Sequence, residues 1–260
     1  MIDTHCHLTY PGLIERLDVV LAGAAAAGIT QMISVGTSPE DAQRAAELAA
    51  AHPAVFAAAG VHPHHAAENR DRARVHETLG LLAAQPRVVA LGEMGLDRHY
   101  PEPPIDMQRN LLEWQLAVAA ELPRSLPIII HNREATDETL AVLRASGLAP
   151  ERFVFHCFTG SDAELDAILA FGARVGFTGI ITFKSARNLA QATARVPLDR
   201  LLTETDAPYL TPEPYRKIKT NEPRYIPEVV RVLARQRSMT EAQIIAVTEA
   251  NARRFFGLPN

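Results

Sequence analysis

Short apolar runs alternate along the chain with longer segments in which apolar residues recur at helical spacing. An apolar run of about four to eight residues rich in Val, Ile and Phe predicts a buried strand. By this criterion we expect strands at Ile2–His7, Gln31–Val35, Val55–Ala59, Val88–Leu91, Ile128–His131, Phe153–His156, Ala173–Gly176 and Leu201–Thr205. The helical pattern predicts helices at Leu13–Ala27, Pro39–Ala51, Arg70–Ala84, Asp106–Glu121, Ala135–Ser146, Ala163–Ala170, Ala186–Ala194, Pro227–Gln236 and Thr240–Phe256.

Eight strands alternating with helices over 260 residues predict an α/β fold, a (β/α)8 TIM barrel with extra C-terminal helices. We expect residues 1–260 to form a single domain, because no linker, low-complexity tract or short repeat interrupts the pattern. An open, doubly wound sheet is the competing fold. The barrel is favoured because most of the predicted strands lead into a polar residue, and barrel enzymes assemble their sites from several strand ends.

Composition narrows the classes of protein. The chain is 47% hydrophobic with a net charge of −4, which excludes a disordered chain and argues against broad binding of duplex nucleic acid. No apolar stretch approaches the ~18 residues of a membrane span, and no signal peptide is visible at the N-terminus. Two cysteines are too few for a disulfide framework and suit a reducing compartment, so we expect a cytoplasmic protein.

The clearest candidates for metal chemistry are His5 and His7 on the first predicted strand. The two-residue period of a strand places both imidazoles on one face and Cys6 on the other. Two neutral imidazoles directed at one point are a common half of a metal site. An isolated pair of histidines with this spacing occurs about as often without a metal ion as with one.

Polar residues at four other strand ends strengthen the prediction of a metal site. Glu93 follows an apolar run and lies between glycines, where an unpartnered charge would be costly. His131 and His156 follow buried-strand patterns, although one such histidine is more often a core residue than a ligand. Asp206 follows the last strand, and a period of two places it on the same side as Glu204. Together these groups offer ligands for two divalent ions, an arrangement that displaces leaving groups from phosphorus, and Asp206 could take a proton from water.

Segments spread over essentially the whole chain resemble the motifs of the TatD-type metal-dependent hydrolases, a deoxyribonuclease family within the amidohydrolase-like barrels. The segments are Ile2–Leu8, Gly60–His64, Leu91–Asp97, Ile130–Ala135, Phe155–Ser161, Thr203–Leu210 and Asn221–Pro223. They occur in the family's order. The resemblance implies a hydrolase that cleaves phosphodiester bonds of DNA with two divalent metal ions per chain.

The resemblance also implies roles for individual residues. One ion would be held by His5, His7, Glu93 and Asp206, and the second by Glu93, His131 and His156. Glu93 and Asp206 would be the catalytic carboxylates, and His62 and His64 would face the substrate phosphate. From the residues alone, His62 and His64 fit solvated loop histidines equally well, because Pro63 ends the strand and would splay the two rings.

The chain departs from the family's pattern outside the implied ligands. Thr9 stands where the family usually has aspartate, and Asn132 replaces the commoner serine. We expect Asn132 and Glu204 to support ligands through hydrogen bonds rather than to bind an ion. The segment Tyr215–Asn221 is longer than the family's usual basic loop and carries Thr220 where arginine is common. These departures bear on substrate preference.

The densest basic group follows the eighth predicted strand and consists of Arg216, Lys217, Lys219 and Arg224. A run of charges is usually a solvated surface. Its place near the strand ends here favours contacts with a phosphate backbone.

Three functions remain in competition. The leading one is a two-metal deoxyribonuclease that trims single-stranded DNA ends. The alternative is a metal-dependent esterase or deacylase acting on aminoacyl-tRNA or another small ester, because activated water attacks carbonyl carbon as well as phosphorus. A catalytically silent binding module is disfavoured by the complete ligand set.

Imidazole and carboxylate ligands accept Zn²⁺, Mn²⁺, Ni²⁺ or Co²⁺, and suit Mg²⁺ less well. The expected partner is DNA, with no membrane and no obligate protein partner.

Overall fold

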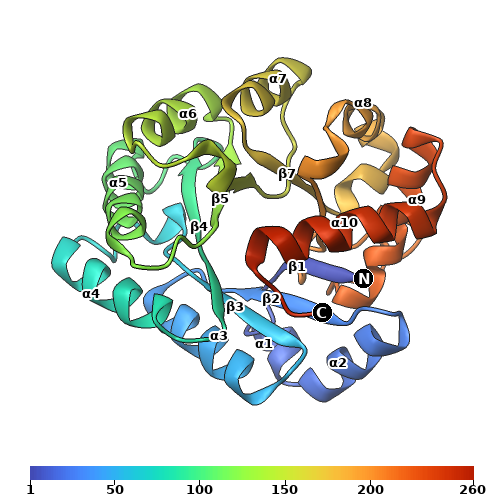
Figure 1. Cartoon of the computed structure of the whole chain (residues 1–260), viewed down its shortest axis with the longest axis horizontal. Coiled ribbons are helices and arrows are strands. Elements are labelled where there is room, and N and C mark those ends of the chain that lie inside the picture. The colour runs from blue at the N-terminus through green and yellow to red at the C-terminus, as the bar shows by residue number, and fades with distance from the viewer. The chain divides into compact units, whose positions relative to one another are not determined.

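The computed structural model describes all residues, 1–260 (Figure 1). The chain divides into two compact units. Unit 1 comprises Met1–Ser34, Cys157–Ser161 and Val175–Asn260, and unit 2 comprises Val35–His156 and Asp162–Arg174. A single domain over residues 1–260 stays a prediction.

Unit 1 contains parallel strands in the order β2–β1–β8–β7. β1 (Ile2–Cys6) pairs with β2 (Gln31–Val35), and β7 (Arg174–Phe177) pairs with β8 (Leu201–Thr203). β1 also adjoins β8, because Cys6 and Ala207 form a parallel bridge and the backbone N–H of His7 donates to the Ala207 carbonyl at 2.7 Å. A first strand that lies beside the last one distinguishes a barrel from an open sheet.

The helices of unit 1 are α1 (Pro11–Ile14), α2 (Leu17–Ala26), α8 (Arg187–Ala192), α9 (Ile226–Arg237) and α10 (Glu241–Phe256). The single helix predicted over Leu13–Ala27 is wrong. Arg16 leaves the helical conformation between α1 and α2, with φ −133° and ψ 33°, and its guanidinium lies 2.5 Å from a carboxylate oxygen of Glu222. α10 begins with a capping box of Thr240 and Gln243 and packs against β1, β8 and α9 (Figure 1).

Unit 2 contains β3 (Val55–Ala59), β4 (Val88–Asp97), β5 (Ile128–Arg133) and β6 (Phe153–Phe155), paired in parallel in chain order. Its helices are α3 (Pro39–Ala51), α4 (Arg72–Ala83), α5 (Ile105–Glu121), α6 (Thr136–Ala145) and α7 (Asp162–Phe171). α3 has its predicted bounds because the Ser38 hydroxyl accepts a hydrogen bond from the Asp41 N–H and Pro39 occupies the first turn.

β4 is longer than the predicted Val88–Leu91. The backbone continues through Gly92 and Gly95 with φ of 117° and 159°. A Cβ on Gly92 would lie 2.5 Å from the carbonyl oxygen of Ile129, and a Cβ on Gly95 would overlap the carbonyl oxygen of His131. Glycine therefore lets β4 approach β5 closely enough to extend the strand pair as far as Asp97 and Arg133.

Three other strands end earlier than predicted. β1 ends at Cys6, β6 at Phe155 and β8 at Thr203, so His7, His156 and Asp206 lie in the segments just after the strands. The other predicted strand and helix bounds agree with the structure to within two residues. Eight parallel strands alternating with helices confirm the predicted (β/α)8 barrel class, with α9 and α10 after the last strand. No helix has both the length and the apolar character needed to cross a membrane.

Candidate metal centre

The end of β1 in unit 1 directs two histidines at an aspartate. The Nε2 atoms of His5 and His7 are 3.3 Å apart. The Oδ1 atom of Asp206 lies 3.7 Å from His5 Nε2 and 3.3 Å from His7 Nε2. Cys6 points away, with its Sγ 3.4 Å from the Ile33 carbonyl oxygen. The predicted division of β1 into a histidine face and a cysteine face is confirmed.

These three donor atoms fit one metal ion. Donors bonded to a tetrahedral ion at about 2.0–2.2 Å lie roughly 3.3–3.6 Å apart. The distances among His5, His7 and Asp206, 3.3 to 3.7 Å, are close to that spacing. Asp206 adopts φ 54°, a left-handed conformation that aspartate tolerates better than most residues, and its N–H donates to the His5 carbonyl at 2.9 Å.

Asp3, to which sequence reasoning assigned no role, ties β1 to the segment that carries Asp206. Its Oδ1 accepts hydrogen bonds from the N–H groups of His5 and Thr205, and its Oδ2 accepts from the Thr205 hydroxyl at 2.6 Å. Complete burial raises the pKa of Asp3 to about 7, although the Thr205 hydrogen bonds oppose the rise. The sequence did contain a signal for this role, because Asp3 is a carboxylate inside an apolar strand and lies on the same face as His5.

A second cluster lies at the ends of β4, β5 and β6 in unit 2. Glu93 Oε2 is 2.8 Å from His156 Nε2 and 3.6 Å from His131 Nδ1, and those two nitrogens are 3.4 Å apart. The separations of 3.4 and 3.6 Å suit two donors on one ion, whereas the 2.8 Å contact between Glu93 and His156 is a hydrogen-bond distance that would lengthen around an ion. Burial alone would raise the pKa of Glu93, but the charge of His156 and the hydrogen bonds from His131 and His156 hold that pKa well below its usual range. Glu93 is therefore a carboxylate at neutral pH.

Asp97 orients His131 and was also missed by sequence reasoning. Its Oδ2 accepts a hydrogen bond from His131 Nε2 at 2.9 Å and lies 3.1 Å from His64 Nε2. Burial would raise the pKa of Asp97, yet the hydrogen bonds from His131 and His64 lower it far below normal. A carboxylate on one imidazole nitrogen directs the other toward a metal, which leaves His131 Nδ1 facing Glu93.

The expectation that Pro63 splays His62 and His64 is wrong. Pro63 begins a short 3-10 turn, η1 (Pro63–His65), in which the His64 N–H donates to His62 Nδ1 at 3.1 Å. The His62 ring centroid lies 4.4 Å from that of His64 and 4.3 Å from that of His131. His62 offers a donor atom within 4.8 Å of donors on Glu93 and His131, so it is a candidate ligand as well as a candidate phosphate contact.

The ionisation state of His62 suits either role. Burial, followed by the charge of His131, holds the pKa of His62 well below its usual value. The imidazole is therefore neutral at physiological pH. A neutral imidazole can coordinate a metal through one nitrogen or donate a hydrogen bond to a phosphate oxygen.

Glu204 supports the backbone near the candidate ligands of unit 1. Its Oε1 accepts a hydrogen bond from the Cys157 N–H at 2.5 Å, and its Oε2 accepts from the Thr4 hydroxyl at 3.3 Å. β8 ends at Thr203, so the two-residue alternation of a strand does not extend to Asp206. Strand geometry therefore does not support the prediction that Glu204 and Asp206 lie on the same side.

Asn132 ties the end of β5 to α6. Its side-chain amide donates to the Thr136 hydroxyl at 2.8 Å, and its carbonyl oxygen accepts from the Thr139 hydroxyl at 2.9 Å. Asn132 thus supports the strand that carries His131 by fixing the following helix.

The basic residues after β8 lie in different environments. Arg224 Nε is 2.5 Å from Glu222 Oε2, which favours a structural role for Arg224 over a phosphate contact. Arg216, Lys217 and Lys219 are exposed. The two lysines have no ion-pair partner, so they remain candidates for contact with a phosphate backbone.

The role of Asp97 leads to a measurable expectation. Asp97→Asn preserves the size of the side chain but replaces the carboxylate behind His131 by an amide. We expect affinity for Zn²⁺ to fall about 10- to 100-fold, the usual cost of losing such a carboxylate. Competition between the apo-protein and a chelator measures this affinity. Asp137→Asn, an exposed position on α6, is the control. Equal affinity in both variants would contradict the assignment.

The barrel fold and the two donor clusters are those of a metal-dependent hydrolase. Residues 2–257 match the family described as TatD related DNase, and the chain belongs to that family. The resemblance inferred from the sequence motifs is therefore confirmed.

Individual relatives match over nearly the full chain. The uncharacterized metal-dependent hydrolase YabD of Bacillus subtilis is 37% identical over 258 residues, 98% of each protein. The 3'-5' ssDNA/RNA exonuclease TatD of Erwinia tasmaniensis is 38% identical over 265 residues, 99% of this chain and 100% of that protein. The crystal structure of YjjV, a TatD homologue from Escherichia coli, matches with a TM-score of 0.91 and 31% identity, covering 100% of this chain and 98% of that one.

Proposed function

We propose that this hydrolase is a two-metal phosphodiesterase that removes nucleotides from the ends of single-stranded DNA. The observation that carries the proposal is the pair of donor clusters, His5–His7–Asp206 in unit 1 and Glu93–His131–His156 in unit 2, each with three donor atoms near enough to converge on one ion. Two ions are a recurrent device for displacing a leaving group from phosphorus. By analogy with the Erwinia relatives named 3'-5' exonucleases, cleavage would start at the 3' end.

The protein's own residues would position the substrate and move the proton. Bound metal ions would supply Lewis acidity toward phosphoryl oxygens and lower the pKa of water. Asp206 is partly exposed and offers a carboxylate oxygen that can accept the proton of the attacking water. Asp97 keeps His131 Nδ1 directed toward Glu93, and neutral His62 can donate a hydrogen bond to the phosphate.

Exposed aromatic rings beside His7 support a single-stranded substrate. Tyr209 is 53% exposed, and its ring centroid lies 6.1 Å from that of His7 and 6.1 Å from that of Tyr10, which is 42% exposed. Stacking of a base on such a ring contributes about 1–3 kcal/mol and requires a base face free of its neighbours. A single-stranded end offers that face, whereas a base inside a duplex does not.

The proposal is tested by hydrolysis of a substrate panel with metal-reconstituted protein. The panel contains single-stranded DNA, duplex DNA, RNA and aminoacyl-tRNA, and the DNA is labelled at either end. We expect stepwise shortening of single-stranded DNA from its 3' end. Release of the amino acid with the oligonucleotides left intact would replace the proposal with the esterase alternative. No hydrolysis of any substrate by fully metallated protein would contradict both.

The basic loop gives a prediction about binding. If Arg216, Lys217 and Lys219 each neutralise one phosphate, log affinity for single-stranded DNA falls with log salt with a slope of about −2, at roughly −0.7 per contact. Lys217→Ala/Lys219→Ala should reduce the slope to about −0.7 and weaken binding equally for all sequences. Fluorescence anisotropy in chelator measures binding without hydrolysis. Arg70→Ala/Arg72→Ala removes the same charge from the surface of unit 2 as a control. A slope unchanged by the lysine substitutions would make the loop an ordinary solvated surface.

A further inference from the structure

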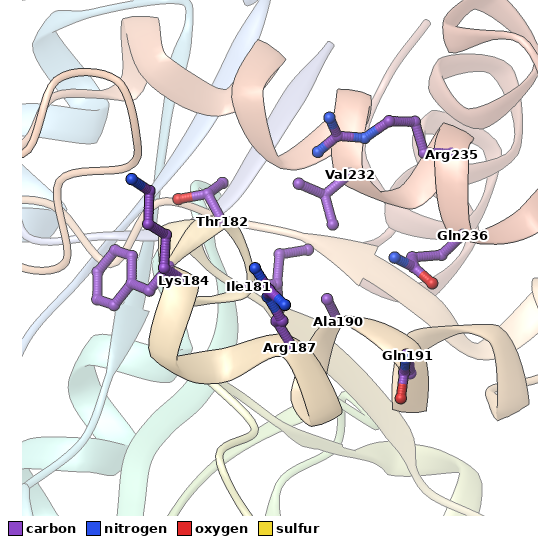
Figure 2. A pocket seen from close by; sticks show the side chains of 10 residues that line it. Ile181, Thr182, Lys184, Arg187, Ala190, Gln191, Val232, Arg235 and Gln236 are labelled. Carbon is purple, nitrogen blue, oxygen red and sulfur yellow. The ribbon is translucent and has the colours of Figure 1, made fainter.

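Unit 1 contains a groove of about 490 Å³ between the segment after β7 and helix α9, here called the α8–α9 groove (Figure 2). Buried apolar side chains lie within it, among them Ile181, Ala190 and Val232. Its other lining residues include three cations and two amides: Lys184, Arg187, Arg235, Gln191 and Gln236. In Figure 2, Lys184 and Arg235 lie on opposite sides of the view with Arg187 between them.

The charge of the groove is uncompensated. No aspartate or glutamate lines it, and Lys184, Arg187 and Arg235 are exposed without an ion-pair partner. Other arginines on the surface do have such partners, as Arg98 has Glu138 and Arg231 has Glu228. Three like charges gathered around one depression create a positive potential that attracts an anion. The two amides can donate further hydrogen bonds to its oxygens.

The groove is continuous with the basic loop after β8. The Thr182 hydroxyl, in the groove, accepts a hydrogen bond from the Glu213 N–H at 2.8 Å. The Arg216 Cζ lies 3.7 Å from the ring centroid of Phe183, which also lines the groove. Lys217 and Lys219 follow Arg216 in the chain. The cations of the loop, which follows β8, and of the groove thus belong to neighbouring segments of unit 1.

We propose that the α8–α9 groove binds the phosphodiester backbone of a nucleic-acid strand, as a second binding site for the part of the strand away from the end being cleaved. This inference rests on the proposed function. The volume falls within the range of about 300–1,000 Å³ typical of ligand sites. Binding there is independent of sequence, because ammonium, guanidinium and amide groups contact phosphate oxygens rather than identify base edges. In this proposal a long strand would occupy both the metal centre and the groove, whereas a trinucleotide would occupy only one.

The test uses Arg187→Gln/Arg235→Gln, which removes two positive charges and keeps polar side chains. Affinity is measured in chelator for oligodeoxythymidines of three and about 20 nucleotides, the second longer than the roughly 4–16 nucleotides that a single-strand site covers. We expect the variant to bind the long strand at least about tenfold more weakly, with a salt slope shallower by roughly 1.4 for two lost contacts. Binding of the trinucleotide, metal content and hydrolysis of a small phosphodiester should be unchanged.

Two control measurements separate the possible outcomes. Arg70→Gln/Arg72→Gln removes the same charge from unit 2 and should leave the long-strand affinity near that of the wild type. An unchanged salt slope in Arg187→Gln/Arg235→Gln, or equal losses for short and long strands, would overturn the groove proposal. If long-strand binding depends on the groove but no DNA is hydrolysed, the groove stands and the proposed nuclease function fails. If DNA ends are hydrolysed but the salt slope of Arg187→Gln/Arg235→Gln equals that of the wild type, the nuclease function stands and the groove proposal fails.

Discussion

Glu93→Gln is expected to abolish most hydrolysis and to lower the metal content of the purified protein. Glu93 Oε2 is 2.8 Å from His156 Nε2 and 3.6 Å from His131 Nδ1, and His62 lies near the same carboxylate. An amide oxygen carries no net charge and is a weaker ligand than a carboxylate. The family resemblance implies that Glu93 serves both ions, so its loss should lower the metal-to-protein ratio below the roughly two ions per chain of a two-metal enzyme.

The fold should survive this substitution, because glutamine has nearly the same size and the strand pairing of β4 uses only backbone groups. Metal content is measured after dialysis against trace Zn²⁺ or Mn²⁺, and turnover is measured with labelled single-stranded DNA. Thermal unfolding in chelator should differ little from that of the wild type. Glu77→Gln, an exposed position on α4, makes the same chemical change away from the site. Near-normal turnover by Glu93→Gln would refute the two-metal mechanism.

Local patterns predicted most of the fold, because each strand and helix is bounded by residues that act locally. The strands Gln31–Val35 and Val55–Ala59 agree with the structure at both ends. The helix Pro39–Ala51 does too, since Ser38 and Pro39 determine its start. The first helix was mispredicted because Arg16 pairs with Glu222, a residue distant in sequence that no periodicity reveals.

The residues that support the candidate ligands were harder to predict than the ligands themselves. Histidines after apolar strands are conspicuous in a sequence. The role of Asp97, by contrast, depends on the register that pairs β4 with β5 and so brings its carboxylate to His131. Asp3 acquires its role only when Thr205 folds back beside β1. Both are carboxylates in apolar strands, where an unpaired charge is costly, and that cost was the usable signal.

The sequence also failed to show which residues of the basic cluster are paired with a carboxylate on the surface. Charge density alone grouped Arg224 with Arg216, Lys217 and Lys219. The structure pairs Arg224 with Glu222 and leaves the lysines without an ion-pair partner. Lys184, Arg187 and Arg235 were not grouped at all, because Arg235 is far from the other two in the sequence and joins them only in the folded chain.

Asp206→Asn is expected to lower turnover by about 10²-fold or more, the usual scale for loss of a general base. The Asp206 Oδ1 atom lies 3.3 Å from His7 Nε2, and its backbone N–H is bonded to the His5 carbonyl, so the asparagine side chain should occupy the same position. An amide retains an oxygen able to coordinate an ion but cannot accept the proton of water. Substrate affinity should therefore change little while the chemical step slows.

A slower reaction could also arise from weaker metal binding, and saturation separates the two causes. Steady-state rates are measured with labelled single-stranded DNA at increasing Zn²⁺ or Mn²⁺, together with the metal content of the same samples. Loss of a base leaves turnover low at full occupancy, whereas loss of a ligand is reversed by excess metal. Asp199→Asn, exposed in the same unit and outside the donor cluster, controls for the loss of charge. If substrate affinity collapses in Asp206→Asn while turnover at saturation survives, Asp206 positions the substrate and another group accepts the proton.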